Sequence, residues 1–192
     1  DRRQRQMCIR DSITNLIKED KINSHIWTSI DNYIMQVEKI SQVLIQENAE
    51  NREIYVKNTE EYIKSLKELK EMYNAELKGL SGERAVCLNE ALEYLAKDIN
   101  LKVTSLHTDH DEGSVSAENL RMLIDEMKNE DIKIILVGKE DNIKNAEIIA
   151  NETGAKIYKL NTSLNGEINN TSYINEMKEN IRILKDVEGN ED

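Results

Sequence analysis

The chain has 192 residues with a formal net charge of −11, 33% charged residues, and no proline or phenylalanine, a length that suits one or two domains with a well-filled core. Its acidity argues against a nucleic-acid partner, because binding to phosphates requires clustered Lys and Arg side chains. No apolar run is long enough to cross a bilayer and no secretory signal opens the chain, so we expect any export signal to lie upstream of Asp1.

Residues 1–11 differ from the rest of the chain because four of them are Arg. We interpret residues 1–11 as a non-native segment that resembles translated sequencing-adapter read-through, and we exclude it from the fold prediction. The alternative is a basic arm that binds nucleic acid or a membrane. On the first interpretation the native protein extends further upstream, and the chain is truncated.

Two amphipathic helices are predicted next. The first begins near Ser29, with Thr28 or Ser29 as its cap, and the second covers about 52–80 and ends at Ser81-Gly82. The stripe of the second helix is rich in Tyr, which favours packing on a globular lobe over a coiled-coil seam. The two stripes contain Ile30, Tyr33, Val37, Ile40 and Leu44, and then Tyr55, Tyr62, Leu66, Leu69, Tyr73, Leu77 and Leu80.

After Gly82, short apolar runs alternate with helical segments, which predicts a parallel sheet with helices on its faces. The fold class is therefore α/β: two helices, one very long, within 12–82, followed by a lobe, 83–192, with a four-stranded parallel sheet flanked by helices. The predicted strands are 84–88, 102–106, 133–137 and 156–160, and the predicted helices are 90–97, 116–129, 141–153 and 172–187.

Ligands of such lobes bind where the strands end. Asn89 and the segments 107–114, 138–142 and 161–171 are expected at that edge. The loop 107–112 contains His107, Asp109 and His110, whose imidazole and carboxylate groups suit Zn, Mn or Ni. The alternative interpretation is a solvated acidic loop.

Enzyme chemistry is not predicted. Residues 137–140 lack the first Gly of a phosphate-binding loop and the Ser or Thr after its Lys, and no GxSxG is present. Cys8 and Cys87 form no disulfide framework, and Cys87, in an apolar run, is expected to be buried. A small α/β enzyme that uses His107 or His110 as a base is the weakest alternative, because no nucleophile motif accompanies either histidine.

The segment 23–30, Asn-Ser-His-Ile-Trp-Thr-Ser-Ile, resembles one that carries a ligand histidine in the metal-binding solute receptors of zinc and manganese ABC importers, although both prolines of the family's segment are absent. The resemblance extends from about residue 23 to 187 and includes four further segments. These are 50–69, like the family's long linking helix, and 91–95, 147–157 and 171–180.

The resemblance implies two lobes joined by a rigid helix, with metal between them and the first ligand histidine upstream of this chain. Residues 12–82 would then hold a remnant of the N-terminal lobe and the long linking helix, and residues 83–192 would form the C-terminal α/β lobe. Of the family's ligands only His25 is kept, because the other positions fall on Asn89, Gly138 and Thr171. His25 alone cannot build a four-coordinate site. One explanation is a degenerate site or altered specificity. In the others, the loop 107–112 supplies replacement ligands, or the alignment shifts by one and Glu90 is a ligand. The predicted metal residues are His25, Glu90, His107, Asp109 and His110.

The function implied is the solute-binding component of a zinc or manganese importer, which is no enzyme and has no catalytic cofactor. It would capture a divalent cation between its lobes and deliver it to the ABC permease. We expect it in the periplasm or on the extracellular face of the membrane, attached only through a lipid anchor missing from this chain. The alternative is a degenerate binding protein without metal that acts as an interaction or scaffold protein, its long helix pairing with another chain.

Overall fold

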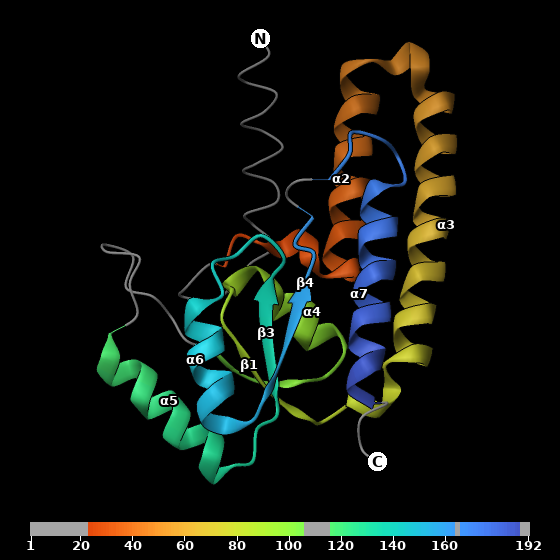
Figure 1. Cartoon of the computed structure of the whole chain (residues 1–192). Helices are drawn as coiled ribbons and strands as arrows, with labels where there is room; N and C mark the ends of the chain where they lie inside the picture. Colours follow the sequence, from red (N-terminus) through yellow and green to blue (C-terminus); the bar gives the residue numbers. More distant parts are fainter. Residues whose placement is uncertain (1–22, 106–115, 164–165, 189–192) are drawn as a thin grey trace.

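The computed structural model describes residues 23–105, 116–163 and 166–188. Its centre is a sheet of four parallel strands in the order β2-β1-β3-β4 (Figure 1). All four predicted strands are present: the fourth matches its predicted bounds, the first ends one residue earlier than predicted, and the third is shifted by one residue. Leu106, the predicted end of the second strand, lies outside the described residues. The strands are β1 Arg84–Cys87, β2 Lys102–Ser105, β3 Ile134–Gly138 and β4 Lys156–Leu160.

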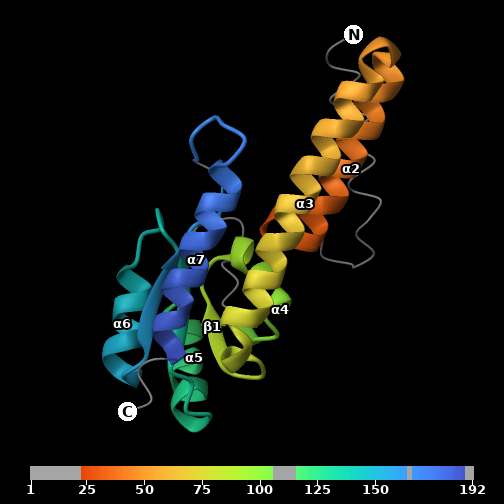
Figure 2. The same ribbon diagram turned by 90° about the vertical axis from the view of Figure 1, so that its right-hand side faces the viewer.

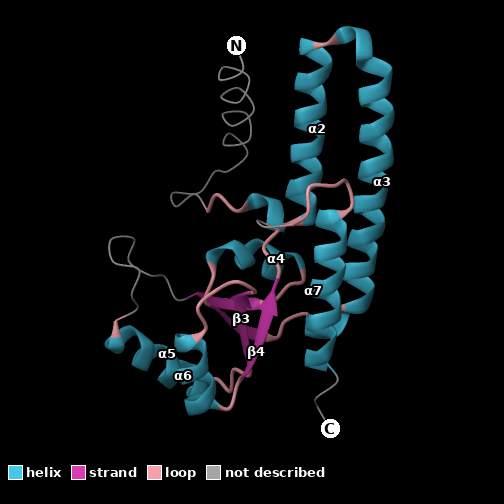
Figure 3. Ribbon diagram, turned by 45° about the horizontal axis from the view of Figure 1, so that its top comes forward, coloured by secondary structure: helices cyan, strands magenta, loops and turns pink. Residues whose placement is uncertain are grey.

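Helices cover both faces of this sheet, which confirms the predicted α/β class (Figures 1 and 3). One face carries α5 Ala117–Asn129 and α6 Lys144–Thr153. The other face carries α4 Glu93–Asp98, α7 Ser172–Glu188, the base of α2 Ile30–Glu47 and half of α3 Arg52–Glu76. Short 3-10 turns connect the elements: η1 Ile26–Thr28, η2 Ala49–Asn51, η3 Lys78–Leu80 and η4 Glu90–Leu92.

Side chains of the two central strands alternate between two cores, as strand geometry requires. In β1, Val86 packs toward α5 and α6, whereas Ala85 and Cys87 pack toward α3, α4 and α7. In β3, Ile135 belongs to the first core and Leu136 to the second. Cys87 is buried, as predicted, and its burial raises the pKa of the thiol to about 12. Both central strands are thus covered on both faces, which is typical of parallel sheets.

Helices α2 and α3 form an antiparallel hairpin that is only partly embedded in the lobe. Leu66, Leu69 and Tyr73 of α3 are buried in the lobe core, whereas the distal half of the hairpin projects beyond it (Figures 1 and 2). There Ile54 is 56% exposed, and the Thr59 hydroxyl donates to Ser41 Oγ across the hairpin at 2.7 Å. The predicted packing of the second helix on a globular lobe therefore holds for its proximal half. None of the helices within the described residues is both long enough and apolar enough to cross a membrane.

The base of the hairpin is joined to the lobe at the start of α2. Ser29 caps the helix by accepting from the Asn32 N–H at 3.3 Å, as one of the two predicted capping residues. Its hydroxyl donates to Asp98 Oδ1 at 3.0 Å, and the Ile30 N–H donates to Asp98 Oδ2 at 2.9 Å. A carboxylate at the end of α4 thus satisfies a free N–H of the first turn of α2, so the two helices are held in one orientation.

Gly154 ends α6 in the left-handed region, with φ of 72°, as its place after the helical pattern predicted. The substitution Gly154→Ala is expected to lower the free energy of unfolding by about 1 kcal/mol, because a Cβ is disfavoured at this φ. Urea denaturation followed by circular dichroism measures the change. Asn151→Ala, an exposed position on the same helix, is the control, and equal destabilisation by the two substitutions would contradict the expectation.

Candidate functional site

The carboxyl edge of the sheet brings together several segments that the sequence placed there. Asn89 follows β1, Gly138 ends β3, and Asn161 follows β4. The turn η1, which precedes α2, packs against α4 and η4 at this edge. The polar residues that follow the strands therefore lie beside the segment that contains His25.

His25 is held at this edge by its Nδ1 atom. That atom lies 2.9 Å from Asn23 Oδ1 and 3.5 Å from Glu90 Oε1. The His25 side chain is 21% exposed and that of Glu90 is 49% exposed. Metal-binding histidines commonly donate one ring N–H to a carbonyl or carboxylate oxygen and bind the metal through the other nitrogen. With Nδ1 directed at two oxygens, Nε2 is the nitrogen left for a metal ion, and Glu90 is placed to orient the ring.

The segment around His25 is fastened to the lobe at several points. Asn23 donates through Nδ2 to the Glu90 carbonyl at 2.7 Å, and its own carbonyl accepts from the Tyr94 hydroxyl at 3.2 Å. The Trp27 indole N–H donates to the Thr162 carbonyl at 2.9 Å. The His25 ring meets that of Trp27 edge to face, with centroids 5.2 Å apart. His25 is therefore part of a preorganised surface.

Asn89 is committed to structural hydrogen bonds. Its side-chain oxygen caps η4 by accepting from the Ala91 N–H at 2.9 Å, and its Nδ2 donates to Asp141 Oδ2 at 2.8 Å. Asn89 is therefore engaged at both ends of its side-chain amide in contacts within the protein. Because the amide oxygen already accepts a hydrogen bond and the amide nitrogen donates one, this side chain is a poor ligand for a cation.

Asp141 fills the space beside Gly138. The Gly138 N–H donates to Asp141 Oδ2 at 2.7 Å, and a Cβ at position 138 would lie only 2.7 Å from the same oxygen. Because this carboxylate closes the turn after β3, α6 begins at Lys144 and not at residue 141 as predicted. Asp141 lies in the segment 138–142 that was expected at this edge, although it was not named as a candidate site residue. The sequence does contain a pattern that indicates this turn: an Asp three residues after the Gly that ends a strand.

Thr171 is exposed and bonded locally: its N–H and hydroxyl donate to Asn169 Oδ1 at 2.9 and 3.0 Å. The structure thus brings His25 and Glu90 together, whereas within the described residues Thr171 forms no hydrogen bond with either of them. His107, Asp109 and His110 lie outside the described residues, and their role as metal ligands stays a prediction. The described parts of the chain contain no group of three or more His, Cys, Asp or Glu side chains that could hold a metal ion.

Comparison with known proteins finds a match to the family described as "Zinc-uptake complex component A periplasmic", over residues 4–187. Among curated proteins, the high-affinity zinc uptake system protein ZnuA of Bacillus subtilis is 30% identical over 169 residues, 86% of this chain and 53% of the relative. The manganese-binding lipoprotein MntA of Halalkalibacterium halodurans is 25% identical, over 86% of this chain and 57% of the relative. The chain thus spans about half the length of these relatives.

A solved structure with a similar fold is that of the solute-binding protein FpvC of Pseudomonas aeruginosa in complex with Mn²⁺. The likeness has a TM-score of 0.76 with 28% identity, and it covers 85% of this chain and 62% of that protein. A second structure of FpvC, with a Ni²⁺ ion, gives a TM-score of 0.78 with 26% identity, over 89% of this chain and 66% of that protein.

Proposed function

Because the chain belongs to the zinc-uptake complex component A family of metal-binding ABC transporter substrate-binding proteins, we propose that it captures a divalent cation, zinc or manganese, for an ABC importer. Its role would be to hold the cation in a cleft at the carboxyl edge of the sheet and to deliver it to the permease. The family's members are binding components of transporters and not enzymes, and the cation would be cargo.

The observation that carries this proposal is the orientation of His25. A ring whose Nδ1 lies beside Asn23 Oδ1 and Glu90 Oε1 is locked in one plane, and its Nε2 is then a preorganised donor. Zinc prefers four ligands. We propose His107, Asp109 and His110 as the further donors, with Glu90 either orienting His25 or joining the coordination shell.

The proposed location is the periplasm or the extracellular face of a membrane. It is supported by the word "periplasmic" in the family's description and by the word "lipoprotein" in the name of the Halalkalibacterium relative. The proposed partner is a membrane permease. We also propose that residues 1–11, which lie outside the described residues, are a non-native addition.

A second candidate function is a degenerate binding protein without metal, acting through protein contacts. Two observations favour it: the oxygen of Asn89 is used as a cap, and Thr171 is bonded within its own loop. Both positions correspond to ligands in the family that the chain resembles.

Zinc titration by calorimetry on the full chain separates the two candidates. We expect saturable binding that His25→Ala abolishes and that Glu90→Gln weakens about tenfold, because loss of an orienting partner typically costs 10- to 100-fold in affinity. Glu118→Gln, an exposed substitution on α5, is the matched control. Binding insensitive to His25→Ala would overturn the proposed role of this histidine. No binding by the unsubstituted chain would leave two explanations, the degenerate protein and a fragment that needs its missing lobe, and the upstream gene sequence would then separate them.

A further inference from the structure

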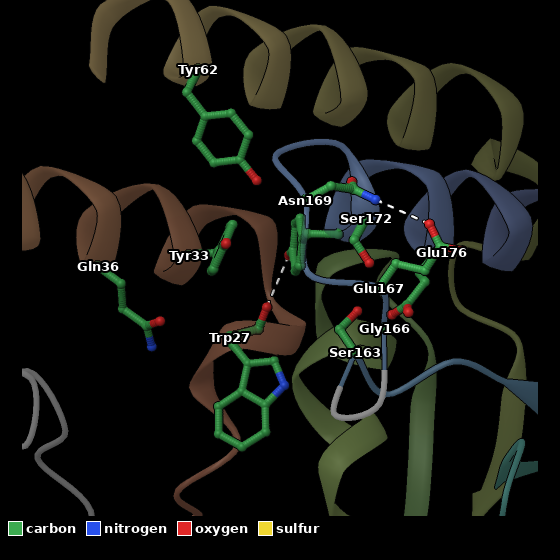
Figure 4. Close-up of a pocket in the computed structure, with 11 residues that line it drawn as sticks. Trp27, Tyr33, Gln36, Tyr62, Ser163, Gly166, Glu167, Asn169, Ser172 and Glu176 are labelled. Carbon is green, nitrogen blue, oxygen red and sulfur yellow. Dashed lines mark hydrogen bonds between the residues drawn. The ribbon is translucent and has the colours of Figure 1, made fainter. Parts of the chain in front are cut away.

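A cavity of about 480 Å³ lies between the helical hairpin and the start of α7 (Figure 4). We call it the aromatic pocket. Trp27, Tyr33 and Tyr62 line one side of it, and Ser163, Glu167 and Glu176 line the other (Figure 4). His25 is not among its lining residues. Its volume falls within the range of small-molecule sites in proteins.

The aromatic side of the pocket is rigid. Tyr33 stacks on Tyr173 with ring centroids 3.8 Å apart and an interplanar angle of 22°, and Tyr62 meets Tyr33 edge to face at 6.4 Å. The Tyr173 hydroxyl donates to the Trp27 carbonyl at 2.9 Å. The Trp27 indole is held in turn by the Thr162 carbonyl. These rings come from η1, α2, α3 and α7, so the arrangement exists before any ligand enters.

The opposite side carries negative charge that the described residues do not neutralise. No Lys or Arg of the described ranges forms an ion pair with Glu167 or Glu176, although other surface carboxylates, such as Glu179 and Glu130, have such partners. Within these ranges the only hydrogen bond to the Glu167 carboxylate comes from Asn169 Nδ2 at 3.2 Å. Both carboxylates are thus available to a cation.

The side chain of Ser163 provides independent evidence that the pocket binds a ligand. Its hydroxyl oxygen is buried and has no hydrogen-bond partner, the one such side-chain atom found among the described residues. Its backbone lies in the left-handed region with φ of 57°, which is uncommon for a residue other than Gly. Buried polar atoms are normally paired, because leaving one unpaired costs free energy. A ligand N–H would supply the missing bond.

Aromatic faces together with unneutralised carboxylates are the chemistry that recognises organic ammonium groups. The rings attract the charge through their quadrupoles and cover the apolar carbons beside it, and the carboxylates compensate the charge itself. A zinc or manganese ion is held by several imidazole, thiolate or carboxylate ligands, whereas the described lining of this pocket contains two carboxylates and no His or Cys. We propose that the aromatic pocket binds an organic ammonium cation. This site is distinct from the metal site proposed above and does not depend on it.

Trp27 is the only tryptophan in the chain, so its fluorescence reports directly on this pocket. We would titrate the full chain with the diamine cadaverine in buffer containing EDTA, which removes any contribution from metal ions, and use sodium chloride at matched ionic strength as the reference. The expected result is a saturable change with cadaverine and none with sodium chloride. Calorimetry under the same conditions provides an independent readout.

Glu176→Gln keeps the shape of the side chain and removes its charge, and it is expected to weaken cadaverine binding about fivefold or more. Tyr62→Leu should weaken it as well, because it removes a ring but no charge. Glu118→Gln changes the net charge equally at a distant site and is expected to leave the affinity unchanged. A non-saturating response, or equal affinities in Glu176→Gln and Glu118→Gln, would overturn the proposal. Since no zinc is present, either result is independent of the metal site.

Discussion

Replacing Asn180 by Asp is expected to lower the free energy of unfolding by about 3 kcal/mol or more, because it places an uncompensated charge in the core. Asn180 is fully buried. Its Oδ1 accepts from the Asn161 N–H at 2.7 Å, and its Nδ2 donates to the Asn161 carbonyl at 2.9 Å. A carboxylate cannot make the second bond. Urea denaturation at neutral pH measures the difference between the two chains.

The pH dependence of this difference provides an internal check. Burial raises the pKa of the introduced carboxyl above its value in the unfolded chain, about 3.9. The deficit relative to the unsubstituted chain should therefore be smallest below about pH 4, where the carboxyl is protonated in both states, and it should grow as pH rises through the folded-state pKa. Asn175→Asp, exposed on the same helix, should change stability by no more than about 0.5 kcal/mol. A deficit that does not vary with pH would contradict the argument.

This pair of asparagines also matters for the site. Asn161 is the first residue after β4, and the next residue, Thr162, supplies the carbonyl that holds the Trp27 indole. Disruption of the Asn161–Asn180 pair should therefore loosen the segment that connects the sheet to the aromatic pocket. The Trp27 emission maximum in the native state is expected to move to longer wavelength in Asn180→Asp and to stay unchanged in Asn175→Asp.

The second large effect is expected from Leu66→Ala, which should lower the free energy of unfolding by about 3 kcal/mol, the range found when a buried Leu is truncated and leaves a cavity. Leu66 is fully buried where α3 enters the lobe core. Ile54, on the same helix, is 56% exposed, and Ile54→Ala should cost less than about 0.5 kcal/mol. Chemical denaturation of both variants gives the comparison.

A small loss for Leu66→Ala, close to that for Ile54→Ala, would show that α3 does not depend on the lobe for its stability. Because the two residues lie on one helix and are both truncated to Ala, differences in helix propensity contribute little to the contrast. The comparison therefore isolates the contribution of burial against the lobe.

Most of the fold was predictable because its signals are local. The Lys156–Leu160 strand matched its prediction at both ends, and the helix before it ended at Gly154, as the glycine after the helical pattern indicated. Runs of β-branched and aliphatic residues between turn signals mark strands in any context. The order of the strands was not predicted, because it depends on which distant segments pair and no single segment records that.

The site was predicted less well, because its decisive contacts join positions far apart in the chain. His25 and Glu90 were named from the sequence, and the structure brings them together, yet the commitment of Asn89 to Asp141 joins residues 52 positions apart. The stacking of Tyr33 on Tyr173 likewise could not be predicted. The two residues lie on helices far apart in the sequence, and the local pattern around each indicates only a helix that packs against a core.

The projecting hairpin has a mechanical consequence. With 25 residues, α3 is about 37 Å long, and only its proximal half is buried in the lobe. Leu66, where α3 enters the lobe core, lies 14 residues from Arg52 at the tip, so about 21 Å of the helix extends beyond that point. A rotation of about 5° at Leu66 would carry the far tip by roughly 2 Å, given this length. A small rotation where the hairpin enters the lobe would therefore displace its far tip by more than the length of a covalent bond.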